Sequence, residues 1–321
     1  MDSHRVRPCD AKLSGNRGFP CIVEQTTAHC WFQHRWLEVS SALPILHVSV
    51  SEGAACVLTE SGMARCHMLD AFGNFVSERS WDGVRSISGS SNRNCIATRR
   101  GIVCIGRPMC GGIGPTHGEQ WIYHGSDIDS ILVTDSSVYA KSMSGVVWGW
   151  GRNIGRRINP GVSAEVCVNH LMVYERCSAF ADAESYSCCL DHGEVRCRGR
   201  GFWQSGPDAV EGAASFEWAS RVDRGVRSIA SSDESVCVVD QRGEVRCWGS
   251  ITPMRSELAG IDLTVEVDRI QLHRGGLCVS GAGNIRCLGA DPLRGSVPDR
   301  PLDIWIDFPR WTAATTPSTG R

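Results

Sequence analysis

The sequence predicts an all-β fold, a seven-bladed β-propeller built from about seven repeats of 40–50 residues. Three observations support this fold class. A frame of two cysteines, separated by nine or ten residues, recurs along the chain. A glycine lies between the cysteines in most copies, where a hairpin turn needs a residue with positive φ. No stretch of about a dozen residues sustains the periodicity and capping pattern of a helix.

The cysteine frame is clearest at 237–249, where two valine-rich runs flank a turn. Five further copies share it: 21–32, 56–68, 95–106, 188–199 and 278–289. The turn glycines are Gly62, Gly101, Gly145, Gly193, Gly243 and Gly283. Short strand-like runs precede most hairpins: His47–Val50, Val84–Ile87, Ile128–Val133, Val226–Ile229 and Arg269–Leu272. Seven copies at the observed spacing fill nearly the whole chain.

The copy at 139–151 lacks both cysteines and carries Tyr139 and Gly149 in their places. Their joint loss is expected if the two side chains touch, because a tyrosine beside a glycine fills the same space. Simple drift of this copy is the alternative.

The repeats predict one domain. We expect residues 1–308 to form a single β-propeller, closed by pairing of the N- and C-terminal segments. Leu302–Phe308 is the strand-like run that would complete this closure. Residues 309–321 are polar and small, and we expect them to be a flexible C-terminal tail.

The complete frame, from the short strand to the turn glycine and Val-Arg-Cys-Trp-Gly, resembles the regulator of chromosome condensation repeat family. It is most similar to the bacterial members with a cysteine pair in each repeat. The best matches are 226–249 and 145–153, whereas the family's Gly-Gln-Leu-Gly ending is absent from every copy. The resemblance implies a seven-bladed propeller used mostly for protein binding. Known members include a nucleotide exchange factor, a plant photoreceptor and a β-lactamase inhibitor, so function must be argued from sites.

Twelve of the 17 cysteines form six candidate disulfides, since hairpin partners face each other at a distance that permits a bond after modest adjustment. The pairs are Cys21/Cys30, Cys56/Cys66, Cys95/Cys104, Cys188/Cys197, Cys237/Cys247 and Cys278/Cys287. Buried unpaired thiols are the alternative, and zinc is disfavoured because each pair stands alone while a structural site takes four ligands. The cysteines outside the frame are Cys9, Cys110, Cys167, Cys177 and Cys189. Cys167/Cys177 is a candidate extra pair, and the odd total leaves at least one cysteine free or bonded outside the chain.

Disulfides indicate an oxidising compartment, so we expect an extracellular or cell-surface protein. The first residues, from Met1 to Cys9, contain no apolar segment of a secretory signal. Either the chain lacks its leader, or export takes another route, or the thiols stay reduced. We favour the first explanation.

Composition and motifs exclude several function classes. A net charge of -2 argues against nucleic-acid binding, and no apolar run is long enough to span a membrane. Nucleophile-elbow, zinc-protease and phosphate-loop motifs are absent. Asp127 and Asp129 alternate in a loop and are interpreted as solvated. We therefore expect no enzyme activity, no catalytic residue, no cofactor and no metal site.

The remaining function is non-enzymatic binding of another protein by a monomeric, secreted or surface-exposed propeller, through loops on one face of the ring. The intervals 106–128 and 199–226 supply Trp121, Trp203 and Trp218 as candidate contacts, because exposed tryptophans are common binding hot spots. Core packing is the alternative role of these tryptophans. Two other functions stay open: an intracellular exchange-factor-type regulator of a small GTPase, and an enzyme that uses the central channel.

Overall fold

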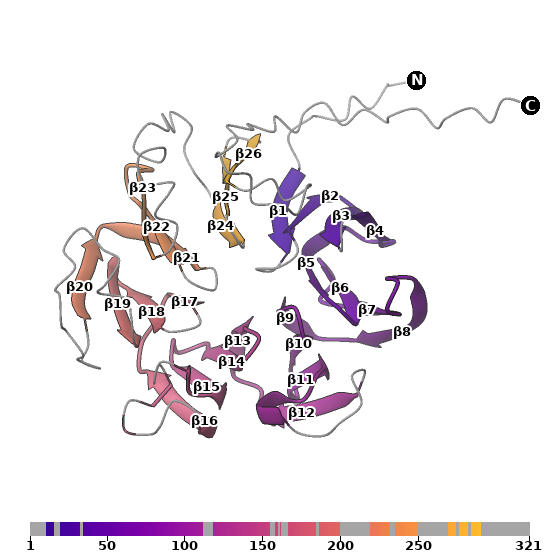
Figure 1. Cartoon of the computed structure of the whole chain (residues 1–321), viewed down its shortest axis with the longest axis horizontal. Coiled ribbons are helices and arrows are strands. Elements are labelled where there is room, and N and C mark those ends of the chain that lie inside the picture. Colours follow the sequence, from indigo (N-terminus) through magenta and orange to yellow (C-terminus); the bar gives the residue numbers. More distant parts are fainter. Residues whose placement is uncertain are drawn as a thin grey trace, which may run out of the picture.

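A computed structural model describes residues 11–15, 20–32, 35–111, 118–154, 158–159, 161, 166–183, 186–199, 219–231, 235–249, 269–273, 276–281 and 284–289. The strands within these residues form seven antiparallel sheets, which follow one another around a ring (Figure 1). We call each sheet a blade and number the blades 1 to 7 in chain order. The all-β propeller predicted by the repeats is confirmed.

Blades 1 to 3 each contain four described strands. Blade 1 contains β1 (Ala11–Gly15), β2 (Pro20–Glu24), β3 (Thr27–Phe32) and β4 (Arg35–Ser40). Blade 2 contains β5 (Ile45–Ser51), β6 (Ala54–Thr59), β7 (Ala64–Leu69) and β8 (Phe75–Trp81). Blade 3 contains β9 (Val84–Gly89), β10 (Arg93–Thr98), β11 (Gly101–Gly106) and β12 (Glu119–Tyr123). A short 3-10 helix, η1 (Met109–Gly111), follows β11, although no helix was expected.

Blades 4 and 5 also contain four described strands, and blades 6 and 7 contain three. Blade 4 contains β13 (Ile128–Val133), β14 (Ser137–Ser142), β15 (Val147–Arg152) and β16 (Cys167–Tyr174). Blade 5 contains β17 (Ala179–Ala183), β18 (Tyr186–Asp191), β19 (Glu194–Gly199) and β20 (Ala219–Arg224). Blade 6 contains β21 (Val226–Ser231), β22 (Ser235–Asp240) and β23 (Val245–Gly249). Blade 7 contains β24 (Arg269–His273), β25 (Gly276–Gly281) and β26 (Asn284–Gly289).

The first strand of each blade lies nearest the centre of the ring (Figure 1). The hydrophobic core is divided among the contacts between neighbouring blades. Ala54 and Cys56 of blade 2, for example, share a buried cluster with Ile87 and Ile96 of blade 3. The ring closes where β1 contacts β24, β25 and β26. Leu302–Phe308 and the tail at 309–321 lie outside the described residues, so their closing and flexible roles stay predictions.

The turn glycines take the expected conformation. Gly62 has a φ of 77° and Gly243 a φ of 83°, in the left-handed region that a Cβ disfavours. Each turn therefore brings the two central strands of its blade into a tight hairpin.

The hairpin register confirms the cysteine pairing. Disulfides join Cys21–Cys30, Cys56–Cys66, Cys95–Cys104, Cys188–Cys197 and Cys237–Cys247, with Cα–Cα distances of 3.9–4.1 Å. Cys278 lies opposite Cys287 in the same register, and their side chains lie outside the described part.

Two further disulfides do not follow the repeat. Cys110 bonds Cys167, and Cys177 bonds Cys189. The extra pair expected between Cys167 and Cys177 is therefore wrong. The first bond links η1, which lies between β11 and β12 of blade 3, to β16 of blade 4, and the second links the segment after blade 4 to β18 of blade 5. These bonds leave Cys9, which lies outside the described residues, without an assigned partner.

Candidate functional site

Blade 4 departs from the repeat at the point where its cysteines are missing. Tyr139 lies directly opposite Gly149, and its side chain is 1% exposed. A Cβ on Gly149 would come within 3.1 Å of the Tyr139 ring and 2.9 Å of Val173. The tyrosine therefore fills the space of the missing disulfide, which confirms the paired exchange expected from the sequence.

Trp148, the residue before Gly149, is a second departure. In four other copies an arginine precedes the second cysteine: Arg65, Arg196, Arg246 and Arg286. Arg65 and Arg196 form ion pairs with Glu78 at 3.2 Å and Glu194 at 3.7 Å on their own blades. Trp148 is instead half-buried against the cluster between blades 3 and 4. The repeat position that holds a solvent-exposed arginine in blades 2 and 5 therefore holds an aromatic ring in blade 4.

Aromatic rings from blades 3 and 4 meet around His170 of β16. Its ring centroid lies 4.5 Å from Trp148, 5.3 Å from Trp150 and 5.3 Å from Tyr123 of β12. Trp150 is buried, Tyr123 and Trp148 are partly exposed, and His170 is exposed. We call Tyr123, Trp148, Trp150 and His170 the aromatic seam. It presents flat apolar surface with polar edges, which suits a protein contact.

The backbone holds His170 in an unusual conformation. Its φ is 43°, and the register between β15 and β16 shifts beside it. Such bulges redirect side chains and are common near functional sites, where unfavourable dihedrals are held by the surrounding packing. The shift turns the imidazole onto the two tryptophans.

The end of β12 and the segment that follows it adjoin Tyr123 of the aromatic seam. Trp121 is 38% exposed, and its ring stacks on His124 at 5.5 Å. The Tyr123 hydroxyl donates to Asp127 at 3.0 Å. Burial, together with the Asp127 carboxylate, raises the pKa of Tyr123 above its usual value, so the hydroxyl stays a donor at neutral pH.

Hydrogen bonds from both neighbouring blades fix this segment. Arg85 of blade 3 donates to the carbonyls of Ser126 at 2.8 Å and Ile128 at 3.0 Å. The Met143 amide of blade 4 donates to the Asp127 carbonyl at 2.9 Å. The Met143 side chain is 71% exposed and touches Arg85. Aromatic residues, methionine and arginine are the types enriched in protein interfaces, and here a fixed backbone presents them together.

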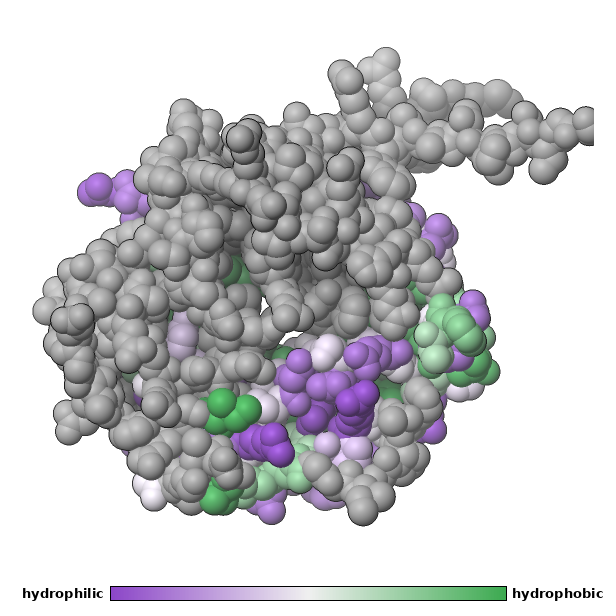
Figure 2. All heavy atoms as spheres, in the orientation of Figure 1, coloured by the Kyte–Doolittle hydropathy of each residue, from purple (hydrophilic) through white to green (hydrophobic). Residues whose placement is uncertain are grey.

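A second exposed apolar group lies on the rim of blade 2. Phe72, Phe75 and Val76 are 77%, 49% and 62% exposed, and Figure 2 shows a hydrophobic area on this side of the ring. Asp70 accepts the amides of Phe72 and Asn74, which fixes the turn before β8. His67 packs on Phe75 at 4.9 Å, and we consider this group secondary to the aromatic seam, where four rings meet.

The structure places one of the three predicted contact residues. Trp121 lies on β12 two residues before Tyr123, and its ring stacks on His124, whereas Trp203 and Trp218 lie outside the described residues. Trp148 and His170 were not singled out by sequence reasoning. The replacement of the repeated arginine could have identified Trp148 from the sequence. Nothing in the sequence indicates the positive φ of His170.

Acidic and metal-ligating residues are dispersed in the part of the chain that the structure describes. Asp127 accepts from Tyr123, and Asp129 pairs with Lys141 at 2.7 Å. Within the described ranges, no three of the histidine, cysteine, aspartate and glutamate residues are grouped to hold a metal ion. None of the helices described there has the length and hydrophobicity to cross a bilayer.

The chain was compared with known families, curated proteins and solved structures. No family model matches it, and no curated protein matches its sequence significantly. Human WBSCR16 superposes with a TM-score of 0.62 at 15% identity, covering 88% of this chain and 92% of that one. Yeast RCC1 (Prp20), solved with Kap60, gives 0.60 at 12% identity over 90% and 84%. The fold is an RCC1-like β-propeller.

The same fold extends to a plant receptor. The CRINKLY WD40 ectodomain of the Arabidopsis thaliana receptor kinase ACR4 superposes with a TM-score of 0.55 at 12% identity, over 87% of this chain and 94% of that one. Identities this low establish the fold alone. The function of this RCC1-like propeller must therefore come from its own side chains.

Proposed function

We propose that this RCC1-like propeller is a non-enzymatic protein-binding module that contacts its partner through the aromatic seam and the segment from Trp121 to Ile128. The observation that carries the proposal is the replacement of a repeated arginine by Trp148 in blade 4. The repeat does not need a tryptophan there, since four copies fold with arginine. Tryptophan is among the residues that dominate binding energy at interfaces, so a gain in contact explains the replacement.

The polar groups near the aromatic seam favour binding over catalysis. Asp127 is engaged by Tyr123, and Arg85 by two backbone carbonyls. These groups position a surface and leave no nucleophile beside a general base.

The partner lies in an oxidising compartment, at the cell surface or outside the cell. Seven disulfides within the described residues support this location. Native protein should expose one alkylatable thiol, Cys9, when unfolded without reductant, and 17 after reduction. The measurement is intact mass after alkylation. Seventeen modified thiols without reductant would contradict the location.

Trp148→Arg tests the binding surface, because it restores the residue that other blades carry. The partner would first be captured by crosslinking the purified propeller to surface-exposed and secreted proteins. We expect the variant to bind this partner at least about tenfold more weakly, with an unfolding free energy within about 1 kcal/mol of wild type. Arg196→Ala, at the same repeat position in blade 5, is the matched control and should bind normally. Equal binding by Trp148→Arg and wild type would overturn the proposal.

A further inference from the structure

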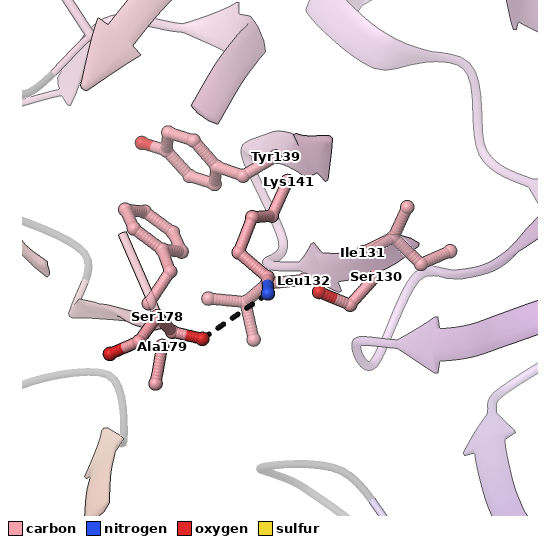
Figure 3. A pocket seen from close by; sticks show the side chains of 8 residues that line it. Ser130, Ile131, Leu132, Tyr139, Lys141, Ser178 and Ala179 are labelled. Atoms are coloured by element: carbon pink, nitrogen blue, oxygen red, sulfur yellow. Dashed lines mark hydrogen bonds between the residues drawn. The ribbon is translucent and has the colours of Figure 1, made fainter. Parts of the chain in front are cut away.

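A cavity of about 260 Å³ lies between the inner strands of blades 4 and 5 (Figure 3). Its lining residues come from β13, β14 and β17 with the residue before it: Ser130, Ile131, Leu132, Tyr139, Lys141, Ser178, Ala179 and Phe180. Tyr139 and Ile131 are buried, whereas Ser178 is exposed. The cavity therefore reaches from the blade core to the surface.

The cavity exists because the contact between blades 4 and 5 lacks the hydrogen bonds that close the contact between blades 3 and 4. Between blades 3 and 4, the amides of Ile131 and Val133 donate to the hydroxyls of Ser86 at 3.2 Å and Ser88 at 3.1 Å. In blade 4 the corresponding positions hold Ser130 and Leu132. Leucine offers no hydroxyl, and the Ser130 hydroxyl makes no hydrogen bond among the described residues.

The facing strand leaves the space open through one small residue, Ala179, and one ring that packs to the side, Phe180. Ala179 occupies the repeat position of Ser86, and Phe180 that of Ile87. The Phe180 ring packs on Tyr139 at 4.8 Å, which draws it to one wall. Figure 3 shows Tyr139, Leu132 and the Lys141 amine around the cavity that these residues line with Phe180.

Lys141 supplies the charged group of the lining. Its ammonium donates to Asp129 at 2.7 Å and to the Ser178 carbonyl at 3.2 Å. An ammonium has three N–H donors, so one is left for an occupant. Asp129 already neutralises the charge, and the Ser130 hydroxyl is a second available group. The site thus suits a neutral acceptor, such as a peptide carbonyl, carried on an apolar body.

The cavity is smaller than the roughly 300–1,000 Å³ of cofactor and drug-sized sites. The segment from Trp121 to Ile128 runs into β13, which lines the cavity, and Lys141 of the lining lies two residues before Met143. We propose that the cavity receives one bulky apolar side chain, phenylalanine or leucine, of the partner polypeptide, whose backbone carbonyl accepts from Lys141 and Ser130. This inference rests on the proposed protein-binding function and specifies its anchor.

The lysine content permits a direct test with a small probe. The chain has two lysines, Lys12 and Lys141, so protein with lysine labelled at its ε carbon with ¹³C gives two side-chain signals. Lys12→Arg assigns them. Titration with N-acetyl-L-phenylalaninamide should shift the Lys141 signal saturably, with a roughly millimolar Kd, and leave Lys12 unchanged. N-acetylglycinamide, which lacks the apolar body, should shift neither signal. An unchanged Lys141 signal at saturating probe would overturn the proposal.

A filled cavity extends the test to the partner. Ala179→Leu should weaken probe binding and binding of the captured partner at least about tenfold, with thermal unfolding close to wild type. Ser228→Leu, the same repeat position in blade 6, is the matched control and should leave both unchanged.

The two tests separate the two proposals. Loss of partner binding by Trp148→Arg but not by Ala179→Leu would overturn the anchor and keep the binding function. If the wild-type protein binds the probe but both variants bind the partner normally, the proposed function and the partner side chain as occupant are both overturned. The cavity would then be a site for free small molecules.

Discussion

Blade 4 has two different neighbours, and the contacts on its two sides are built differently. On the blade 3 side, Ser86 and Ser88 bond the inner strand of blade 4, and the Cys110–Cys167 disulfide ties the outer parts. On the blade 5 side, a cavity lies between the inner strands, and the Cys177–Cys189 disulfide joins the segment before β17 to β18. One contact is closed at its centre, and the other is open.

This difference indicates which parts of the fold tolerate sequence variation. The interior of each blade is fixed by its hairpin, and cysteine pairs occupy the same register in blades 1, 2, 3, 5 and 6. The contacts between blades use single side chains that differ from copy to copy. A hydroxyl replaced by leucine opens a cavity without disturbing the strands on either side. Binding features can therefore appear between blades while the repeat is kept.

The largest difference should come from the two disulfides outside the repeat. Replacing both Cys110 and Cys167 by serine should lower the unfolding free energy by about 4 kcal/mol, because the bond closes a loop with a sequence separation of 57 in the unfolded chain. Removing Cys177–Cys189, with a separation of 12, should cost about 3 kcal/mol. Urea unfolding measures both. The hairpin pair Cys95–Cys104 is the control at about 2.5 kcal/mol. A greater loss from the shorter separation would show that strain, not chain entropy, sets the order.

Gly149 probes the open side of blade 4. Gly149→Cys should lower the unfolding free energy by about 2 kcal/mol, since its Cβ would press on Val173 and Tyr139. Adding Tyr139→Cys removes the obstruction and recreates the hairpin pair, which should recover most of the loss. Thiol counting and thermal unfolding check both steps. If the double variant were no more stable than the single one, the tyrosine would not be a replacement for the disulfide.

The sequence predicted what repeats. Turn glycines and cysteines at a fixed spacing specified the hairpins, because strand register follows from the turn. It missed Cys177–Cys189, and it could not specify Cys110–Cys167, because this bond joins segments whose distance depends on how blades 3 and 4 pack. The sequence did contain a pattern that could have placed Cys177, since it occupies the same inner-strand position as Val84 and Val226. The backbone amide of each of these residues donates to the carbonyl of the turn glycine in the preceding blade.

The candidate site was predicted only in part. Trp121 was chosen as an exposed residue between hairpins, and it is 38% exposed. Trp148 lies in a repeat frame in which tryptophan is usually structural. Only a comparison with the arginines at the same position of other copies would have singled it out. The rotation of His170 follows from a local register shift, which composition and periodicity do not encode.

Serine-to-alanine substitutions sharpen the comparison with a smaller effect. Ser86→Ala should cost about 1 kcal/mol, because it leaves the Ile131 amide without this acceptor between blades 3 and 4. Ser130→Ala, at the same repeat position, should cost less than about 0.5 kcal/mol, since its hydroxyl faces the cavity. Chemical denaturation resolves the two. Equal losses would mean that Ser130 closes its contact as Ser86 does.

Alkaline pH should distinguish the two sides through their tyrosines. Tyr174 packs in the cluster between blades 4 and 5 and donates to the Ser187 carbonyl at 2.7 Å, and burial raises its pKa strongly. Tyr123 lies on the blade 3 side, where burial and Asp127 raise its pKa while its ring stays partly exposed.

A raised folded-state pKa means that the protonated tyrosine contributes stability that is fully present below about pH 10, the unfolded value, and is lost as the pH rises beyond it. The unfolding free energy, measured from pH 8 to 11 with Cys9 alkylated to prevent disulfide exchange, should therefore decline above pH 10. Tyr174→Phe should flatten this decline more than Tyr123→Phe, because full burial penalises the phenolate more than partial exposure does. The opposite order would mean that Tyr123 is more enclosed than Tyr174, and would assign the aromatic seam a structural rather than a binding role.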